Sequence, residues 1–202
     1  MKRIAVLVSG GGTNLQALID AQQRGELGGG QIVAVISSKP GAYALERAAK
    51  AGIPGYVLPR KEFDSNQAMT IALVEKLREL EIDLVVLAGC MIIFTQELVD
   101  AYPNAIMNVH PALIPSFCGP GYYGLHVHEE ALRYGVKVSG ATVHFVNEIP
   151  DGGEIILQKA VEILPDDTPE VLQKRVMEQA EWTLLPLAVE AVAKEIENER
   201  LA

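Results

Sequence analysis

The chain has 202 residues, of which 49% are hydrophobic and 21% charged, as in an ordinary soluble domain with a sizeable core. Its net charge of −9 includes no basic run, which argues against binding to nucleic acid or to a membrane surface. No signal peptide or 18-residue apolar span is evident. The two cysteines, Cys90 and Cys118, suggest neither a disulfide framework nor a metal site, so we expect a cytoplasmic protein without a bound metal.

The first element is a buried strand over residues 4–8, followed directly by the polar, glycine-rich stretch 9–14. Apolar residues at helical spacing come next. A strand, a glycine turn and a helix in this order point free backbone N–H groups at a phosphate. The stretch is not a dinucleotide fingerprint, because Leu15 occupies the third glycine position, and it is not a P-loop. A tight turn that merely needs glycines is the alternative.

The pattern then alternates strands and helices up to residue 110, which predicts a doubly wound, mostly parallel α/β sheet of Rossmann-like type. The apolar run 84–88 lacks alternation, as expected for a central strand covered on both faces. Asp64 or Ser65 and later Thr95 are expected helix caps. The other expected strands cover 32–37 and 56–58, and the expected helices cover 43–51 and 65–80.

The second half differs in character. Residues 116–124 form a glycine-rich loop with aromatic residues, and a helix is expected over 125–134. Two adjacent strands, 138–146 and 154–163, suggest an antiparallel addition to the sheet. Thr168 should cap the final helix, and Pro186 should kink or break it.

Between the two halves lies the stretch from Ile106 to Pro115. If 106–110 is a strand, Asn108 and His110 face the same side while Met107 and Val109 face the opposite, packed side. Pro111 ends the strand, so an amide and an imidazole lie at its carboxyl end, where open α/β sheets bind ligands. A histidine can transfer protons near neutral pH, and an amide can donate to an oxyanion.

These features together resemble the folate-dependent formyltransferase family. The matching motifs occur in the family's order over most of the chain. They are Ser9-Gly10-Gly11-Gly12-Thr13-Asn14, Asn108-Val109-His110-Pro111-Ala112-Leu113-Ile114-Pro115, Gly124-Leu125-His126, Val143-His144-Phe145-Val146 and Asp151-Gly152-Gly153. The N-terminal glycine loop and the length resemble the branch that acts on glycinamide ribonucleotide.

The resemblance implies transfer of a formyl group from the co-substrate 10-formyltetrahydrofolate to the amine of glycinamide ribonucleotide, in de novo purine biosynthesis. It implies that Asn108 binds the formyl oxygen, that His110 transfers the proton, and that Asp151 raises the pKa of His110. It also implies a cis Ile114–Pro115 peptide bond. Glycinamide ribonucleotide would be held by Gly12, Thr13, Asn14 and Glu181. A bulky side chain in place of Gly12 would then be expected to occupy the place of the phosphate. The reduced folate would lie against Met91, Ile92, Ile93, Phe94, Asn147, Glu148, Ile149 and Pro150.

We therefore expect a single domain over 1–202, with a nucleotide-binding half (1–105) and a catalytic, folate-binding half (106–202). A monomer or homodimer is expected. Taken alone, Asp151 is a usual turn residue, Glu181 a solvated helix acid and His144 a sheet histidine adjacent to the site. His126 and His128 are expected on a helix surface rather than as metal ligands.

Three other interpretations compete. A formyltetrahydrofolate hydrolase would use water in place of the amine, although related hydrolases carry an extra N-terminal regulatory domain that we do not expect here. A non-catalytic dinucleotide-binding module would need the third glycine and a ribose-binding acid after the second strand, and this chain has neither. A purely structural or interaction protein would leave Asn108, His110 and Asp151 unexplained.

Overall fold

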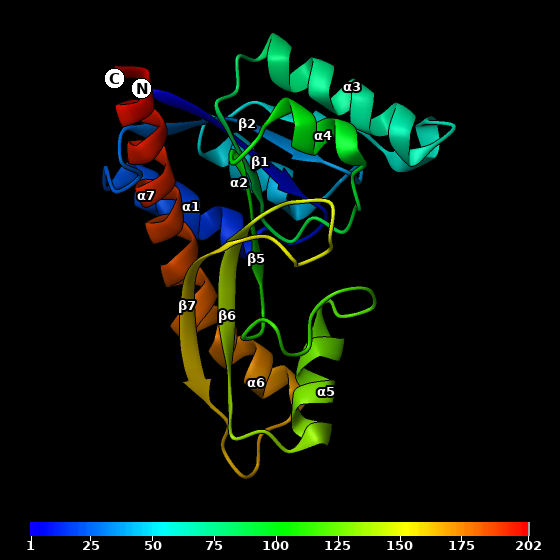
Figure 1. Ribbon diagram of the computed structural model, residues 1–202, viewed down its shortest axis with the longest axis vertical. Coiled ribbons are helices and arrows are strands. Elements are labelled where there is room, and N and C mark those ends of the chain that lie inside the picture. Colours follow the sequence, from blue (N-terminus) through cyan, green and yellow to red (C-terminus); the bar gives the residue numbers. More distant parts are fainter. Residues whose placement is uncertain (202) are drawn as a thin grey trace.

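A seven-stranded sheet runs through the protein, and the computed structural model describes residues 1–201 around it (Figure 1). The strand order is β3-β2-β1-β4-β5-β6-β7, with β1 to β5 parallel and β6 and β7 antiparallel. This confirms the predicted fold class. The strands are β1 (Lys2–Val8), β2 (Gly30–Ser37), β3 (Gly55–Val57), β4 (Leu84–Leu87), β5 (Ile106–His110), β6 (Val138–Phe145) and β7 (Ile155–Glu162).

Helices cover both faces of the sheet. Their bounds are α1 (Thr13–Gln23), α2 (Tyr43–Lys50), α3 (Asn66–Glu79), α4 (Gln96–Ala101), α5 (Leu125–Tyr134), α6 (Pro169–Val176) and α7 (Trp182–Leu201). A short 3-10 turn, η1 (Arg60–Glu62), precedes α3, and a π-helical segment, η2 (Met177–Glu181), joins α6 to α7. No helix within residues 1–201 is long and apolar enough to span a membrane.

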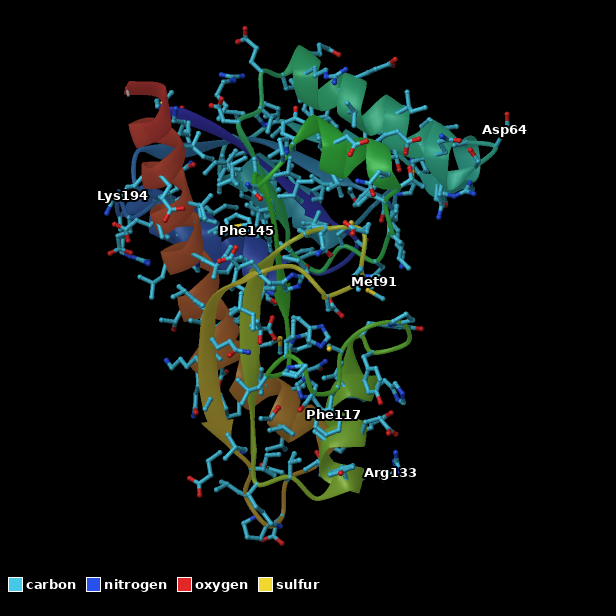
Figure 2. The ribbon with its side chains drawn as sticks, viewed as in Figure 1. Asp64, Met91, Phe117, Arg133, Phe145 and Lys194 are labelled. Atoms are coloured by element: carbon cyan, nitrogen blue, oxygen red, sulfur yellow. The ribbon has the colours of Figure 1, made fainter. Side chains whose placement is uncertain are left out.

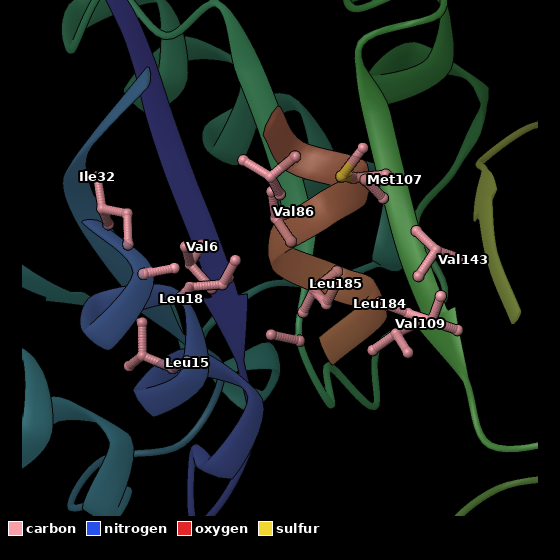
Figure 3. Packing of buried hydrophobic residues seen from close by; sticks show 14 of the residues in the cluster. Val6, Leu15, Leu18, Ile32, Val86, Met107, Val109, Val143, Leu184 and Leu185 are labelled. Carbon is pink, nitrogen blue, oxygen red and sulfur yellow. The ribbon is translucent and has the colours of Figure 1, made fainter. Parts of the chain in front are cut away.

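Two apolar cores hold the layers together. On one face, Leu15 and Leu18 of α1 and Leu185 of α7 pack against Val6 and Met107 of the sheet (Figure 3). On the other face, α3 and α4 cover a second cluster that includes Ile106. Each fully buried leucine or isoleucine contributes roughly 1.5–3 kcal/mol. The central strands β1 and β4 meet both clusters, which explains their continuous apolar sequence.

Two of the predicted helix starts are confirmed by side-chain capping contacts. Ser65 accepts a hydrogen bond from the Ala68 N–H and caps α3, and Thr168 accepts from the Val171 N–H and caps α6. Thr95 is the N-cap residue of α4 but makes no capping side-chain bond. The Ile114–Pro115 peptide bond is cis, as the resemblance implies.

The last helical stretch differs from the prediction. We expected a kink or break at Pro186, but α7 continues through this residue. The regular helix is interrupted earlier, at η2, where the chain adopts π-helical geometry. The segments α6, η2 and α7 follow one another without a gap, so Pro186 lies inside a continuous helical stretch and leaves the Trp182 carbonyl without its usual N–H donor.

Candidate active site

Strand β5 brings an amide and an imidazole to one face of the sheet. Met107 and Val109 point into the core beneath α7, as predicted, and Asn108 and His110 point the other way. Asn108 lies beside Leu87 of β4, the last residue of that strand, so His110 extends beyond the edge of β4. The ring of His110 is nevertheless 96% buried.

Asp151 contacts His110 from the loop over residues 146–153, which follows β6 and folds back against the end of that strand. Gly153 lies directly on the carbonyl of Phe145, where an added Cβ would be 1.7 Å from the oxygen, so only glycine fits there. Asp151 itself has a positive φ of 55°. Its Oδ2 lies 3.5 Å from Nδ1 of His110, and its Oδ1 lies 3.6 Å from Nε2 of His144. One carboxylate therefore faces two histidines.

The hydrogen bonds of His110 define its protonation. Nε2 lies 2.8 Å from the carbonyl oxygen of Phe117, which can only accept, so Nε2 carries a hydrogen. Nδ1 then faces Asp151, and a protonated ring would meet an acceptor at each nitrogen. Burial nevertheless lowers the pKa of His110, and this effect outweighs the opposite effects of Asp151 and the Phe117 carbonyl. Asp151 acts in the predicted direction, but the net shift is downward.

Asp151 is held in its charged form. Burial opposes ionisation, but contacts with His144, His110 and the Gly119 N–H together keep the pKa of this carboxyl below its usual value. The Gly119 N–H donates to Oδ2 over 2.8 Å. Asp151 is therefore a structured carboxylate of the site and not merely a turn residue.

His144 orients Asn108. Its Nδ1 donates to the Phe145 carbonyl over 2.8 Å, and its Nε2 faces both Asn108 and Asp151. Nδ2 of Asn108 lies 3.3 Å from this Nε2. The amide of Asn108 is thereby held beside the ring of His144. This arrangement fits the site-adjacent position expected for His144.

The glycine-rich stretch forms an open cavity of about 280 Å³ at the start of α1. Gly12 is the N-cap residue of α1 and has left-handed geometry, with φ 72°. The first N–H groups of a helix have no intrahelical partner, so those of Thr13 and Asn14 are free to bind an anion. The cavity is lined by Gly10, Gly11, Gly12, Thr13, Asn14, Ala88 and Gly89.

Glu181, from the distant C-terminal part of the chain, contacts Asn14, one of the residues that line this cavity. Asn14 Nδ2 donates to its Oε2 over 2.6 Å. Glu181 is only 6% exposed, so the alternative of a solvated helix acid is wrong. Burial raises the pKa of this carboxyl more than the Asn14 contact lowers it. The residue belongs to η2, and π-helical segments are frequent at functional sites.

One detail of the glycine loop corrects the reason for which we expected Gly12 to be essential. A side chain at Gly12 was expected to fill the place of the anion. Instead, a Cβ there would point away to α2 and lie 2.7 Å from Cβ of Ala44. Gly12 is thus required by its positive φ and by close packing of α2.

The residues expected to contact the folate form an exposed apolar surface. Met91 and Ile93 follow β4, Ile149 lies in the Asp151 loop, and all three are more than half exposed. Figure 2 shows Met91 projecting from the loop that follows β4. Between them, Ile92 and Phe94 turn inward and line a small apolar cavity of about 20 Å³. Glu148 and Pro150 are exposed, while Asn147 donates to the Gly152 carbonyl and stabilises the loop.

The sequence did not indicate two backbone groups that contact the site, and the prediction that His128 lies on the surface is wrong. The Phe117 carbonyl and the Gly119 N–H contact His110 and Asp151, but backbone groups leave no residue-type signal. His128 was expected on the surface, yet it is fully buried, and neither ring nitrogen has a hydrogen-bond partner within the described part of the chain. His126 is exposed as expected.

An amide, a buried imidazole and a carboxylate thus lie together in one site, an arrangement suited to group transfer. Residues 2–189 match the formyl transferase family. The chain belongs to this family.

Relatives of known name are similar over nearly the whole chain. The phosphoribosylglycinamide formyltransferase of Haemophilus influenzae is 44% identical over 94% of this chain and 86% of its own length. The trifunctional purine biosynthetic protein adenosine-3 of Drosophila melanogaster is also 44% identical, but this chain spans only 13% of it. Glycinamide ribonucleotide transformylase 1 from Symbiobacterium toebii is 42% identical, with a TM-score of 0.91 over 96% of this chain and 89% of its own.

Proposed function

We propose that this protein transfers a formyl group from 10-formyltetrahydrofolate to the amine of glycinamide ribonucleotide. The observation that carries the proposal is Asp151 between His110 and His144, with Asn108 fixed beside them. The names of the similar enzymes support the same reaction. The reduced folate is a co-substrate, and both substrates leave after each turnover.

In the proposed reaction the amine attacks the formyl carbon. The amide N–H groups of Asn108 and the protonated ring of His110 stabilise the oxyanion that forms. The bond from the formyl carbon to the folate nitrogen then breaks. The amine loses one proton, the folate nitrogen gains one, and His110 carries it between them. No covalent bond to the protein is required, because the amine is itself the nucleophile.

The neighbouring residues have separate proposed roles. Asp151 favours the protonated form of His110 and offsets part of the opposite effect of burial on the pKa of this ring. Gly12, Thr13 and Asn14 bind the phosphate, and Glu181 binds polar groups of the same substrate. The exposed apolar side chains of Met91, Ile93 and Ile149 lie against the folate ring system.

The proposed binding and catalytic functions are divided between the two halves of the chain only in part. Residues 1–105 supply the phosphate cavity, and residues 106–202 supply the proton-transfer group and part of the folate surface. Glu181 crosses this division, because it belongs to the second half but contacts Asn14 in the first. The segment Met91–Phe94 crosses it in the other direction.

The test is a formyl-transfer assay with 10-formyltetrahydrofolate and glycinamide ribonucleotide, alongside a reaction without the amine. We expect tetrahydrofolate to be released only when the amine is present, together with formylated ribonucleotide. Release at the same rate without the amine would instead identify a hydrolase. No reaction in either mixture would reject both enzymatic assignments.

A further inference from the structure

Arg47 contacts the back of the glycine loop, although it lies outside every motif of the site. It belongs to α2 and is partly buried. Its Nε donates to the Gly11 carbonyl over 2.8 Å, and one terminal nitrogen donates to Oε1 of Gln16 over 2.9 Å. The ring of Tyr43 lies 4.9 Å from the guanidinium carbon. One guanidinium thus joins α2, the loop and α1.

The contact with Gly11 controls the direction of the next N–H group. In a planar trans peptide the carbonyl oxygen and the following N–H point in opposite directions. Because Arg47 holds the Gly11 oxygen toward α2, the Gly12 N–H is directed away from α2. A charged donor on the oxygen also polarises the peptide and strengthens its N–H as a donor.

Helix α2 leaves the ligand only one side from which to approach. The Ala44 N–H donates to the Gly10 carbonyl over 3.1 Å, and a Cβ on Gly12 would collide with Ala44. The open side of the loop is the cavity of about 280 Å³. We infer that Arg47 is a positioning residue, which orients the Gly11–Gly12 peptide so that its N–H binds a phosphate ester in that cavity.

The geometry of the side chain matters more than its charge in this inference. Gln16 is fixed in turn, because its Nε2 donates to Oδ1 of Asp20 over 2.8 Å and turns Oε1 toward Arg47. Only a planar fork can meet both the Gly11 oxygen and Gln16, and lysine lacks one. Lys50 provides the matched control, since its Nζ lies 5.4 Å from the centre of the same Tyr43 ring and carries the same charge.

The inference rests on the proposed function for its kinetic test, but a binding test is independent of it. Three variants are compared with wild type: Arg47→Lys, Arg47→Ala and Lys50→Ala. Ribose 5-phosphate is titrated calorimetrically into each protein. Steady-state constants for both substrates are then measured, together with the melting temperature.

We expect both Arg47 variants to weaken ribose 5-phosphate binding about tenfold or more, the scale of one lost charged hydrogen bond and its oriented peptide. The KM for glycinamide ribonucleotide should rise similarly. The KM for the folate and kcat should change less than about threefold, because the lost contact is uniform binding at a remote group. Lys50→Ala should behave as wild type.

Several results would overturn the inference. Wild-type binding by Arg47→Lys would mean that charge alone suffices. Equal increases in both KM values would indicate general loss of structure. If the wild type does not bind ribose 5-phosphate, the assignment of this cavity as a phosphate-binding site is wrong. If Arg47→Ala does not fold, Gln16→Leu replaces it, and this variant should show a smaller loss of the same kind. A wild type that binds ribose 5-phosphate but transfers no formyl group would reject the proposed function and leave the role of Arg47 intact.

Discussion

A single carboxylate serves two histidines, and their different surroundings give them different tasks. Both ring nitrogens of His110 face acceptors, namely the Phe117 carbonyl and Asp151, so this ring is arranged to hold a second proton. His144 donates to the Phe145 carbonyl, and its other nitrogen contacts Asn108 and Asp151, so this ring holds the amide beside the carboxylate. The burial that lowers the pKa of His110 therefore leaves that ring poised to release its proton.

His128 should make the protein sensitive to acid. Burial, together with the charge of His110, lowers its pKa from 6.5 to about 4. The unfolded chain therefore binds this proton more readily, so the stabilisation is present above about pH 6.5 and is lost as the pH falls toward 4. The free energy of unfolding, measured with urea at pH 7 and pH 4, should fall less in His128→Leu, by up to roughly 3 kcal/mol.

His126 is the control for this measurement, because it lies on the same helix but is exposed. The variant His126→Leu should keep the acid sensitivity of the wild type. Equal acid sensitivity in wild type and His128→Leu would show that the buried ring is not the cause.

Side-chain alternation was sufficient to predict part of this site. A period of two placed Asn108 and His110 on one face, and β5 has the predicted bounds. The distance from Asp151 to His110 could not be predicted, because it depends on how residues 146–153 fold back against the Phe145 carbonyl. The burial of His128 and Glu181 depends on the packing of α5 and η2, which no local pattern reports.

At the scale of elements, the loop over residues 116–124 contacts the side chains of both His110 and Asp151 through its backbone. The Phe117 carbonyl accepts from His110, and two residues later the Gly119 N–H donates to Asp151. Phe117 also packs edge-on against Tyr122 and Tyr134. The position of the loop and the protonation of His110 are therefore coupled, because the same backbone stretch binds the proton donor and its counter-charge.

The glycine loop provides a second prediction, because its glycines differ in backbone conformation and in how closely they are packed. Gly12→Ala places a Cβ at positive φ and 2.7 Å from Cβ of Ala44. We expect the free energy of unfolding to fall by about 1–3 kcal/mol, as for other residues forced into a strained backbone region. Denaturation with urea measures the change.

Gly10→Ala is the matched control, because nothing lies within 4 Å of its added Cβ and its φ is not in the positive range. It should change the free energy of unfolding by less than about 0.5 kcal/mol. Equal losses in the two variants would contradict the assignment of close packing to Gly12 alone.

The helices show which features a local sequence pattern can predict and which it cannot. Ser65 and Thr168 cap helices as their sequence predicts, since capping depends on neighbouring residues. The break expected at Pro186 is absent, and the irregular segment is η2, which no residue in the sequence signals. There the chain places Glu181 toward Asn14, so a long-range contact accompanies the local irregularity.

At the scale of the molecule, the two halves share one core and should unfold together. Leu184 and Leu185 of α7 belong to the same cluster as Val6 of β1 and Val143 of β6 (Figure 3). Trp182, the only tryptophan, begins α7 and reports on the second half. Unfolding followed by tryptophan fluorescence and by far-ultraviolet circular dichroism should give coincident urea transitions.

Two separated transitions would mean that residues 1–105 and 106–202 are independent folding units. The alternation of strands and helices was enough to predict the sheet, because each strand reports its own burial. This alternation could not predict that α7 packs against α1, because these two helices lie far apart in the sequence.

The most direct test of the account is the dependence of kcat on pH in Asp151→Asn. The change is nearly isosteric but removes the charge that favours protonated His110, so the fall of kcat with rising pH should move to lower pH. We expect kcat near pH 7 to drop by about 10²-fold or more, with little change in either KM. His110→Ala should be at least as damaging, and the double variant little worse. A normal kcat in Asp151→Asn across about pH 6 to 9, a range that spans the ordinary pKa of histidine, would contradict the mechanism.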